Sequence, residues 1–470
     1  MQQHVDSTDR QTQTMAKSRA SEGSTPREVV RLAVPAFFAL VAEPAFLLVD
    51  SAIVGHLGAT PLAGLAIAST ILVTAVGICV FLAYGTTAVV ARQIGAGDRA
   101  GAITAGIDGS WLALILGTLI GTLVGVGARP LAAAFGPTPQ VLEQAVTYLR
   151  VSAAGIPAML IVLAATGVLR GMLDTRTPLA VSVVGFSVNA ALNYALVYGL
   201  GWGIAGSAWG TVVAQWLMAA ALATVVIRYA ARLRVPLRTH PARVLAAAVS
   251  GIPLLVRTVA LRAILVLTAW VATGLGEVTL AAHQVALTVW IFVTFAFDAI
   301  AIAAQALTGR SLGAGDARAA RDATTLMVRW GMIAGGVALI LIILVRPWLP
   351  ALFTPDENVQ TVLATALSVV ALSMPATAIF CVLDGVLIGA GDTRWLAWSM
   401  VALLAAYVPI ALGIRWVRPV LVGDDPTSVT GQSNGILWLW LAFTALMSVR
   451  AAVLWLRART DRWMRLGHAA

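Results

Sequence analysis

Twelve long apolar stretches run through this chain of 470 residues and restrict what it can fold into. A helix needs about 20 mostly apolar residues to cross the hydrocarbon core of a bilayer. The stretches lie near residues 29–55, 61–91, 106–127, 141–171, 178–199, 204–230, 246–273, 279–308, 323–345, 362–390, 395–414 and 435–457. Because they show no strand-like alternation, their backbone groups must pair within helices. The sequence therefore predicts an all-α polytopic membrane protein with twelve transmembrane helices.

Composition and the placement of charge agree with a bilayer environment. Hydrophobic residues make up 59% of the chain, charged residues 11%, and the mean hydropathy is +0.89, outside the soluble globular range. The formal net charge of +10 gathers in the tails and alternate loops, including the basic runs Arg228 to Arg243 and Arg450 to Arg465. The opposite loops hold only Arg129, Arg346, Arg415 and Arg418. This positive-inside bias predicts cytoplasmic termini in a bacterial-type inner membrane, with anionic lipids and not nucleic acid as partners.

The two halves of the chain repeat one another at a constant offset of 218 residues. The repeated motifs are Gly95-Ala-Gly-Asp98 with Gly313-Ala-Gly-Asp316, Asp174-Thr-Arg176 with Asp392-Thr-Arg394, Pro35 with Pro253, Pro157 with Pro375, Gly167 with Gly385, and Gly171 with Gly389. Near the C-terminus the offset grows to 232 through an insertion around Arg415 to Asn434, which we expect to be an external loop. Each half holds six predicted spans, so both enter the membrane in the same orientation. The repeat predicts two parallel six-helix lobes with substrate bound between them near the midplane.

The repeat also divides the chain into five parts. Residues 1–28 are polar and lack the pattern of a signal peptide, so we expect a disordered cytoplasmic tail. The N-lobe, with helices 1 to 6, is predicted over residues 29–232, and the C-lobe, with helices 7 to 12, over residues 246–460. A cytoplasmic linker at residues 233–245 joins them, and residues 461–470 form a second tail. Because one chain supplies both lobes, we expect a monomer.

Polar residues that only one half keeps are the candidates for function. In the first half they are Glu43, Asp50, Asn189, Asn193 and Thr211. The equivalent positions of the second half hold Leu261, Thr268, Tyr407, Ala411 and Phe443. An ionised side chain at mid-membrane costs at least about 2.5 to 3.5 kcal/mol, so such residues rarely serve stability. We therefore expect Asp50 to have a functional role. Carboxylate, amide and hydroxyl oxygens suit a proton or hard-cation site. Helix–helix packing is the alternative role for the two asparagines, which share a helix face.

The second half has its own unrepeated polar set, namely His283, Gln284, Asp298, Gln305 and Asp384. Gln284, Asp298 and Gln305 follow one helical stripe, and all five residues are predicted to line a substrate cavity in the C-lobe. The alternative is that the acids pair with Arg257 and Arg262 of the preceding span, because buried opposite charges usually find one another. The sequence leaves both interpretations open.

Three segments resemble the multidrug and toxic compound extrusion (MATE) transporters, in particular their DinF-like branch. These are Leu48 to Gly58 (LVDSAIVGHLG), Leu280 to Ala286 (LAAHQVA) and Phe297 to Leu307 (FDAIAIAAQAL), together with the Gly-Ala-Gly-Asp turns. The resemblance covers residues 29–460. It implies two pseudo-symmetric six-helix lobes around a central cavity and cation-coupled antiport by alternating access.

The resemblance also implies roles for individual residues. The cation cluster of related transporters falls on Asp50, Asn189, Asn193 and Thr211, and their helix-bending proline falls on Pro35. Asn193 stands where the family pattern has room for an acid, which lowers the charge of the site. Proton coupling is therefore favoured over sodium, which remains the alternative ion at the Asp50 cluster.

We expect an exporter of organic, cationic or amphipathic drugs or toxins that is driven by a proton gradient. The sequence has neither a His-Glu-x-x-His nor a Gly-x-Ser-x-Gly motif, and Cys79 and Cys381 give no metal or disulfide spacing, so we predict no enzyme activity, no cofactor and no bound metal other than the sodium alternative. Small organic substrates and membrane lipids are the expected partners. A flippase for lipid-linked saccharides is the alternative function.

Overall fold

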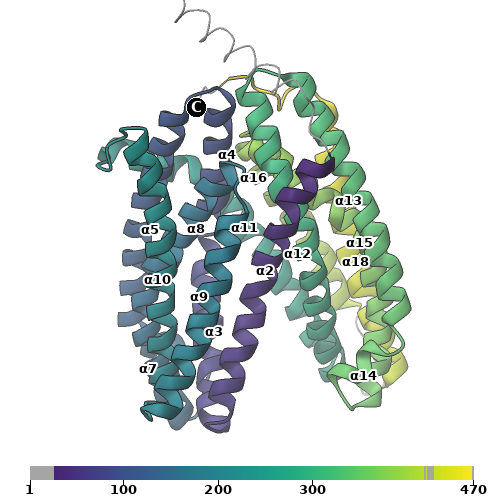
Figure 1. Cartoon of the computed structure of the whole chain (residues 1–470). Coiled ribbons are helices and arrows are strands. Elements are labelled where there is room, and N and C mark those ends of the chain that lie inside the picture. Colours follow the sequence, from purple (N-terminus) through teal and green to yellow (C-terminus); the bar gives the residue numbers. More distant parts are fainter. Residues whose placement is uncertain (1–25, 418–419, 421–427, 468–470) are drawn as a thin grey trace, which may run out of the picture. The chain divides into compact units, whose positions relative to one another are not determined.

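The computed structural model describes residues 26–417, 420 and 428–467, except for the side chain of Glu43 (Figure 1). Twelve helices in this part are long and apolar enough to cross a membrane. They coincide with the twelve predicted stretches, so the prediction of an all-α protein with twelve spans is confirmed. Most of the predicted first tail, part of the predicted external loop and residues 468–470 lie outside the described residues.

The helices differ in length, and some spans are built from two of them. The helices are α2 (Pro26–Gly55), α3 (Ala59–Ile78), α4 (Phe81–Gly95), α5 (Arg99–Val126), α6 (Ala128–Ala133), α7 (Pro139–Ser152), α8 (Ile156–Gly171), α9 (Arg176–Tyr194), α10 (Gly203–Arg232), α11 (Pro241–Leu275), α12 (Glu277–Gly313), α13 (Ala317–Val345), α14 (Leu349–Phe353), α15 (Glu357–Gly389), α16 (Thr393–Trp416) and α18 (Val429–Arg459). The 3₁₀ turn η1 (Ala153–Gly155) joins α7 to α8, and the π-helical turn η2 (Ala195–Gly199) extends α9.

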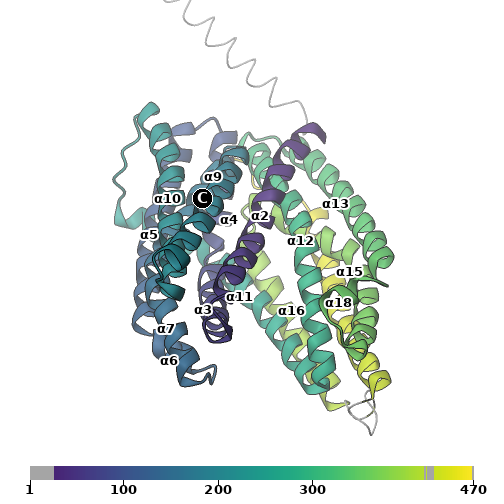
Figure 2. The ribbon, with the colours of Figure 1, turned by 60° about the horizontal axis from the view of Figure 1, so that its bottom comes forward.

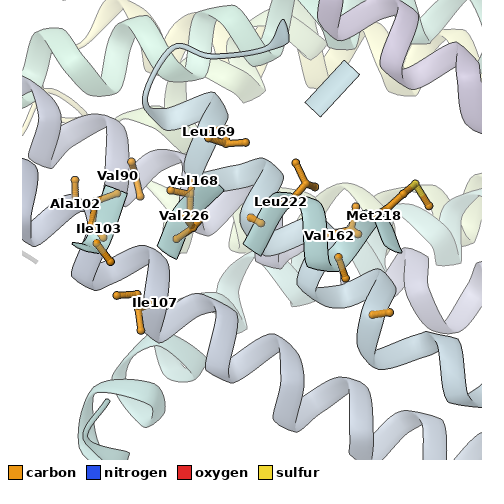
Figure 3. Packing of buried hydrophobic residues seen from close by; sticks show 14 residues of the cluster. Val90, Ala102, Ile103, Ile107, Val162, Val168, Leu169, Met218, Leu222 and Val226 are labelled. Carbon is orange, nitrogen blue, oxygen red and sulfur yellow. The ribbon is translucent and has the colours of Figure 1, made fainter. Parts of the chain in front are cut away.

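The described residues form two compact units, one of residues 31–255 and one of residues 256–467 together with 26–30. We call them the N-unit and the C-unit. In the N-unit, α8 packs against α4, α5 and α10. Figure 3 shows the side chains at this junction, where Val90, Ile103, Val168 and Val226 meet from four helices. In the C-unit, α15 packs against α12, α13 and α18, and α13, α15 and α18 lie side by side in both Figure 1 and Figure 2.

The repeated glycines of α8 and α15 allow close helix packing. A Cβ atom on Gly167 would lie 2.7 Å from the backbone oxygen of Ala83, and one on Gly385 would lie 2.3 Å from that of Ala301. Small residues let transmembrane helices approach until their backbones touch. The same contact, α4 with α8 and α12 with α15, explains why both halves keep glycine at this position.

The repeated Gly-Ala-Gly-Asp turns end one helix and begin the next. Gly97 and Gly315 have φ angles of +83° and +78°, a left-handed conformation that glycine adopts without strain. Asp98 then accepts a hydrogen bond from the backbone of Gly101, and Asp316 accepts one from Ala319. Each aspartate is therefore the N-cap of the following helix, α5 or α13.

Helix α2 carries the predicted coupling aspartate and runs unbroken through Pro35 and Pro44. Each proline removes one backbone donor from the helix, so these turns have fewer internal hydrogen bonds than the rest of α2. Further along, α10 ends at Arg232 and α11 begins at Pro241. The segment between them contacts α5, because Trp111 Nε1 donates to the backbone oxygen of Leu237 at 3.0 Å.

Candidate functional site

The carboxylate of Asp50 is buried inside the N-unit and accepts three hydrogen bonds. Its Oδ1 atom accepts from Asn193 Nδ2 at 2.8 Å and from Ser207 Oγ at 2.5 Å. Its Oδ2 atom accepts from the Tyr148 hydroxyl at 3.2 Å. Only 2% of Asp50 is exposed. Donors from α9, α10 and α7 therefore converge on one side chain of α2.

Three other side chains predicted for this site have oxygen atoms without a hydrogen-bond partner in the described structure. Asn189 Oδ1, Asn193 Oδ1 and Thr211 Oγ1 are buried and lack a hydrogen-bond partner among the described residues. Thr211 lies beside the Tyr148 hydroxyl. A Cβ atom on Gly210 would lie 2.0 Å from Asn193 Oδ1, so the glycine leaves room for the amide of Asn193. The cluster combines one carboxylate with neutral oxygens that remain available as acceptors.

Of the residues predicted for this site, the structure bonds Asn193 directly to Asp50. Asn189 and Thr211 are also buried, but their side-chain oxygens have no hydrogen-bond partner in the part of the chain that the structure describes. The side chain of Glu43 lies outside that part. Sequence reasoning missed Tyr148 and Ser207. Both are unrepeated, since the other half has Ala366 and Leu439 at the corresponding positions.

The corresponding position in the C-unit is neutral. Thr268 replaces Asp50, and its hydroxyl lies 2.9 Å from the hydroxyl of Tyr407, which replaces Asn189. Phe443, fully buried, replaces Thr211. The C-unit therefore has a hydroxyl pair and an aromatic ring at this position, where the N-unit has a buried carboxylate.

The acids of the C-unit are paired with arginines. Asp384 on α15 accepts from Arg257 Nη2 at 2.5 Å and also pairs with Arg450 of α18. Arg450 stacks over the ring of Phe380 at 4.3 Å. Asp298 lies close enough to the two arginines and to Asp384 to interact with their charges. Asp384, Arg257 and Arg450 form an ion-pair cluster that is largely buried, with Asp298 beside it.

This cluster favours one of the two interpretations that the sequence left open, the pairing of Asp384 with Arg257. Arg262 is exposed and takes no part in the described ion pairs. The position of Arg450 is a correction, because the sequence predicts it among the cytoplasmic charges at the end of the chain. Only 2% of it is exposed, and it lies nine residues before the end of α18 at Arg459.

The other predicted cavity residues of the C-unit differ in burial. Gln284 is exposed, whereas Gln305 is buried. His283 is buried next to Trp440, with 5.6 Å between ring centroids, and both of its ring nitrogens lack a hydrogen-bond partner in the described structure. The structure thus brings Asp298 and Asp384 together and leaves Gln284 at the surface of the unit.

Comparison with known proteins decides the family. The MatE family model matches residues 35–195 and 253–417, which are equivalent segments of the two repeats. The chain belongs to the MATE family. It is therefore a multi-pass membrane transporter and not an enzyme.

Two curated relatives and one solved structure illustrate the match. Protein DETOXIFICATION 44, chloroplastic, of Arabidopsis thaliana is 30% identical over 95% of this chain and 85% of its own. DNA damage-inducible protein F of Escherichia coli is 28% identical over 94% of each chain, in agreement with the predicted DinF-like branch. A crystal structure of MATE in the bent conformation shares the MATE fold, with a TM-score of 0.80, 20% identity, and coverage of 93% of this chain and 95% of that one. The family match favours drug and toxin export over the flippase alternative.

Proposed function

We propose that this chain is a proton-coupled antiporter that exports organic, cationic or amphipathic compounds, with Asp50 as the proton carrier. The observation that carries the proposal is the buried Asp50 carboxylate, on which donors from three other helices converge. Membership of the MATE family and the name of the Arabidopsis detoxification protein support the substrate class. A monomer with cytoplasmic termini in a bacterial-type inner membrane belongs to the same proposal.

The hydrogen-bond pattern at Asp50 supports a role for the proton. An ionised carboxylate can only accept hydrogen bonds, and its three neighbours all donate. Protonation adds an O–H donor to a carboxyl group that previously only accepted, and this donor requires an acceptor, which in our proposal rearranges the contacts. The unpartnered oxygens of Asn193 and Thr211 are acceptors in the same cluster. Uptake of one proton thereby changes how α2 contacts α7, α9 and α10.

The position of Pro35 supports a conformational response. Pro35 lies fifteen residues before Asp50 on the same helix and removes a backbone hydrogen bond there. Helices kink at such positions. In our proposal, altered contacts at Asp50 let α2 bend at Pro35 and reduce the cavity of the first lobe. Substrate and proton then occupy the lobe in turn, which gives alternating access and antiport.

Sodium is the alternative coupling ion at the same cluster. Oxygens of Asp50, Asn189, Asn193 and Thr211 are the kind of ligand that hard cations prefer. The proton is favoured because Asn193 is neutral, so that the cluster holds a single carboxylate.

The proposal is tested with purified protein in liposomes loaded with a fluorescent organic cation. A gradient that drives protons into the liposomes should drive efflux of the dye. A sodium gradient of the same size and direction should not. Asp50→Asn keeps the shape of the side chain but cannot carry a proton, so its gradient-driven efflux should fall to the background rate. Thr268→Val changes the corresponding position of the C-unit and serves as the matched control. Efflux by Asp50→Asn with the pH dependence of the unaltered protein would remove Asp50 from the mechanism.

A further inference from the structure

A small cavity of about 240 Å³ lies in the N-unit where the loop between α8 and α9 meets the second turn of α2. It is lined by Arg31, Leu173, Asp174, Thr175 and Arg176. The loop follows the fourth span, so it lies on the same side of the membrane as the beginning of α2. None of its lining residues belongs to the Asp50 cluster, and the proposed transport mechanism makes no use of it.

The polar groups of this cavity are arranged to receive an anion. The guanidinium groups of Arg31 and Arg176 are exposed, and neither forms an ion pair with another described residue. Thr175 is only 4% exposed, and its hydroxyl lacks a hydrogen-bond partner among the described residues. The Thr175 hydroxyl and the two guanidinium groups can all donate hydrogen bonds, and none has an acceptor side chain among the described residues.

Asp174 lines the same cavity, but its carboxylate is engaged within the loop. Oδ1 accepts from the backbone nitrogens of Arg176 and Thr177 at 3.1 and 3.0 Å, and Oδ2 accepts from the Thr177 hydroxyl at 2.6 Å. Asp174 therefore accepts from the first backbone N–H groups of α9 and offsets one of the two arginine charges. One positive charge remains, which matches the single negative charge of a phosphodiester.

Leu173 adds an apolar wall in a conformation that is unfavourable for leucine. Its φ angle is +64°, in the left-handed region where a side chain other than that of glycine is strained. The corresponding residue of the other repeat is Gly391, with φ +76°. The N-unit thus has a strained leucine where the C-unit has an unstrained glycine, and this leucine lines the cavity.

The corresponding loop of the C-unit lacks the other features as well. Asp392 of that loop is paired with Arg457 at 2.8 Å, and at the position equivalent to Arg31 the second sequence repeat has Val249, which cannot bind an anion. The shared Asp-Thr-Arg turn is therefore scaffold in both halves. Arg31 and Leu173 occur in the first repeat alone, and Arg31 completes the arginine pair with Arg176.

We propose that this cavity binds the phosphodiester headgroup of an anionic phospholipid. The two guanidinium groups would hold the phosphate oxygens, since arginine matches phosphate geometry with paired donors. The Thr175 hydroxyl would donate to the same group, and Leu173 would contact the apolar part of the lipid. With the predicted cytoplasmic termini, the cavity faces the cytoplasmic leaflet, which is the anionic one.

Native mass spectrometry of the full chain in detergent tests the proposal, with phosphatidylglycerol and phosphatidylcholine as competing probes. We expect one tightly retained phosphatidylglycerol and weak retention of phosphatidylcholine, whose positive choline faces the arginines. The double variant Arg31→Gln/Arg176→Gln should lose affinity for phosphatidylglycerol by about 100-fold, roughly tenfold for each charged contact. Arg394→Gln, the counterpart of Arg176 in the C-unit, should retain the lipid.

Two further measurements separate a lipid site from a site for free phosphate. Leu173→Gly should unfold at the same or a higher temperature, because it relieves backbone strain. Its affinity for phosphatidylglycerol should nevertheless fall several-fold, because the apolar contact with the lipid is lost. Inorganic phosphate at millimolar concentration should not displace the lipid. Equal retention of phosphatidylglycerol by the double arginine variant would overturn the proposal. Full displacement by inorganic phosphate would overturn the assignment to a lipid.

Discussion

Ser207 Oγ donates a hydrogen bond to Asp50 Oδ1 at 2.5 Å, and both side chains are buried. This contact joins α10 to α2 at the carboxylate on which the three donors converge. The other repeat has Leu439 and Thr268 at the two positions, so it cannot form the same bond. The coupling chemistry that we propose therefore depends on residues that differ between two otherwise similar lobes.

Replacement of Ser207 by alanine should weaken coupling without unfolding the protein. Hydrogen bonds to a charged group contribute about 1.5 to 3 kcal/mol, so loss of one of three donors should lower proton-driven efflux by roughly tenfold. Thr224→Ala is the control on the same helix, because that hydroxyl is exposed and bonds only to the backbone of Ala220. Efflux rates in liposomes at several pH values measure the effect. Equal rates for both variants would contradict a role for Ser207.

The two buried tyrosines should respond differently to loss of the hydroxyl. Tyr148→Phe removes a donor to Asp50, so it should impair proton-driven efflux. Tyr407→Phe breaks the contact with Thr268, which still donates to the backbone oxygen of Ile264, so the cost should be about 1 kcal/mol of stability and no loss of coupling. Thermal unfolding and efflux of both variants, measured side by side, check this. Comparable coupling defects would show that the sites of the two units are not specialised.

The ion-pair cluster of the C-unit should be needed for stability. Asp384→Asn leaves Arg257 and Arg450 buried near each other without their shared acid, which should cost about 3 to 5 kcal/mol. The double variant Asp384→Leu/Arg450→Met removes one charge of each sign and should recover much of that loss. Thermal unfolding in detergent measures both. Normal stability of Asp384→Asn together with lost export would instead support the direct substrate role predicted from the sequence.

The sequence predicts the scaffold well because its signals are long. Each span extends over about 20 apolar residues, and the repeat places the glycine contacts and the helix caps twice. The sequence also predicts Asp50 and Asn193 in one site, because a buried acid needs polar partners. Tyr148 and Ser207 were missed because hydroxyl residues are common in membrane helices, and only the packing of α7 and α10 against α2 brings these two to the carboxylate.

Arg450 shows a second limit of sequence reasoning. An arginine near a helix end normally extends its charged group to the membrane surface, and a basic cluster reads as cytoplasmic. Its contact with Asp384 depends on how α18 packs against α15, because the two residues are 66 positions apart in the chain. No periodicity within α18 specifies that partner.

Gly385→Ala should disrupt the packing of the C-unit. The added methyl group would lie 2.3 Å from the backbone oxygen of Ala301, so α12 and α15 would have to separate, at a cost of about 1 to 3 kcal/mol or more. Gly336→Ala on α13 is the control, because nothing lies within 4 Å of the added atom. Thermal unfolding of the two variants should show a large decrease for the first and little change for the second. Similar unfolding temperatures would contradict the close approach of the two helices.

His283 should be replaceable by leucine, the residue that the first half has at the corresponding Leu65. The imidazole is buried with both nitrogens lacking a partner in the described structure, and a polar group in that condition costs about 1 to 3 kcal/mol. Leucine removes this cost and forfeits the contact with the ring of Trp440. We therefore expect His283→Leu to unfold at the same or a higher temperature and to export normally. Loss of export with unchanged stability would mean that the imidazole acts on substrate or protons, as its unrepeated position in the sequence predicts.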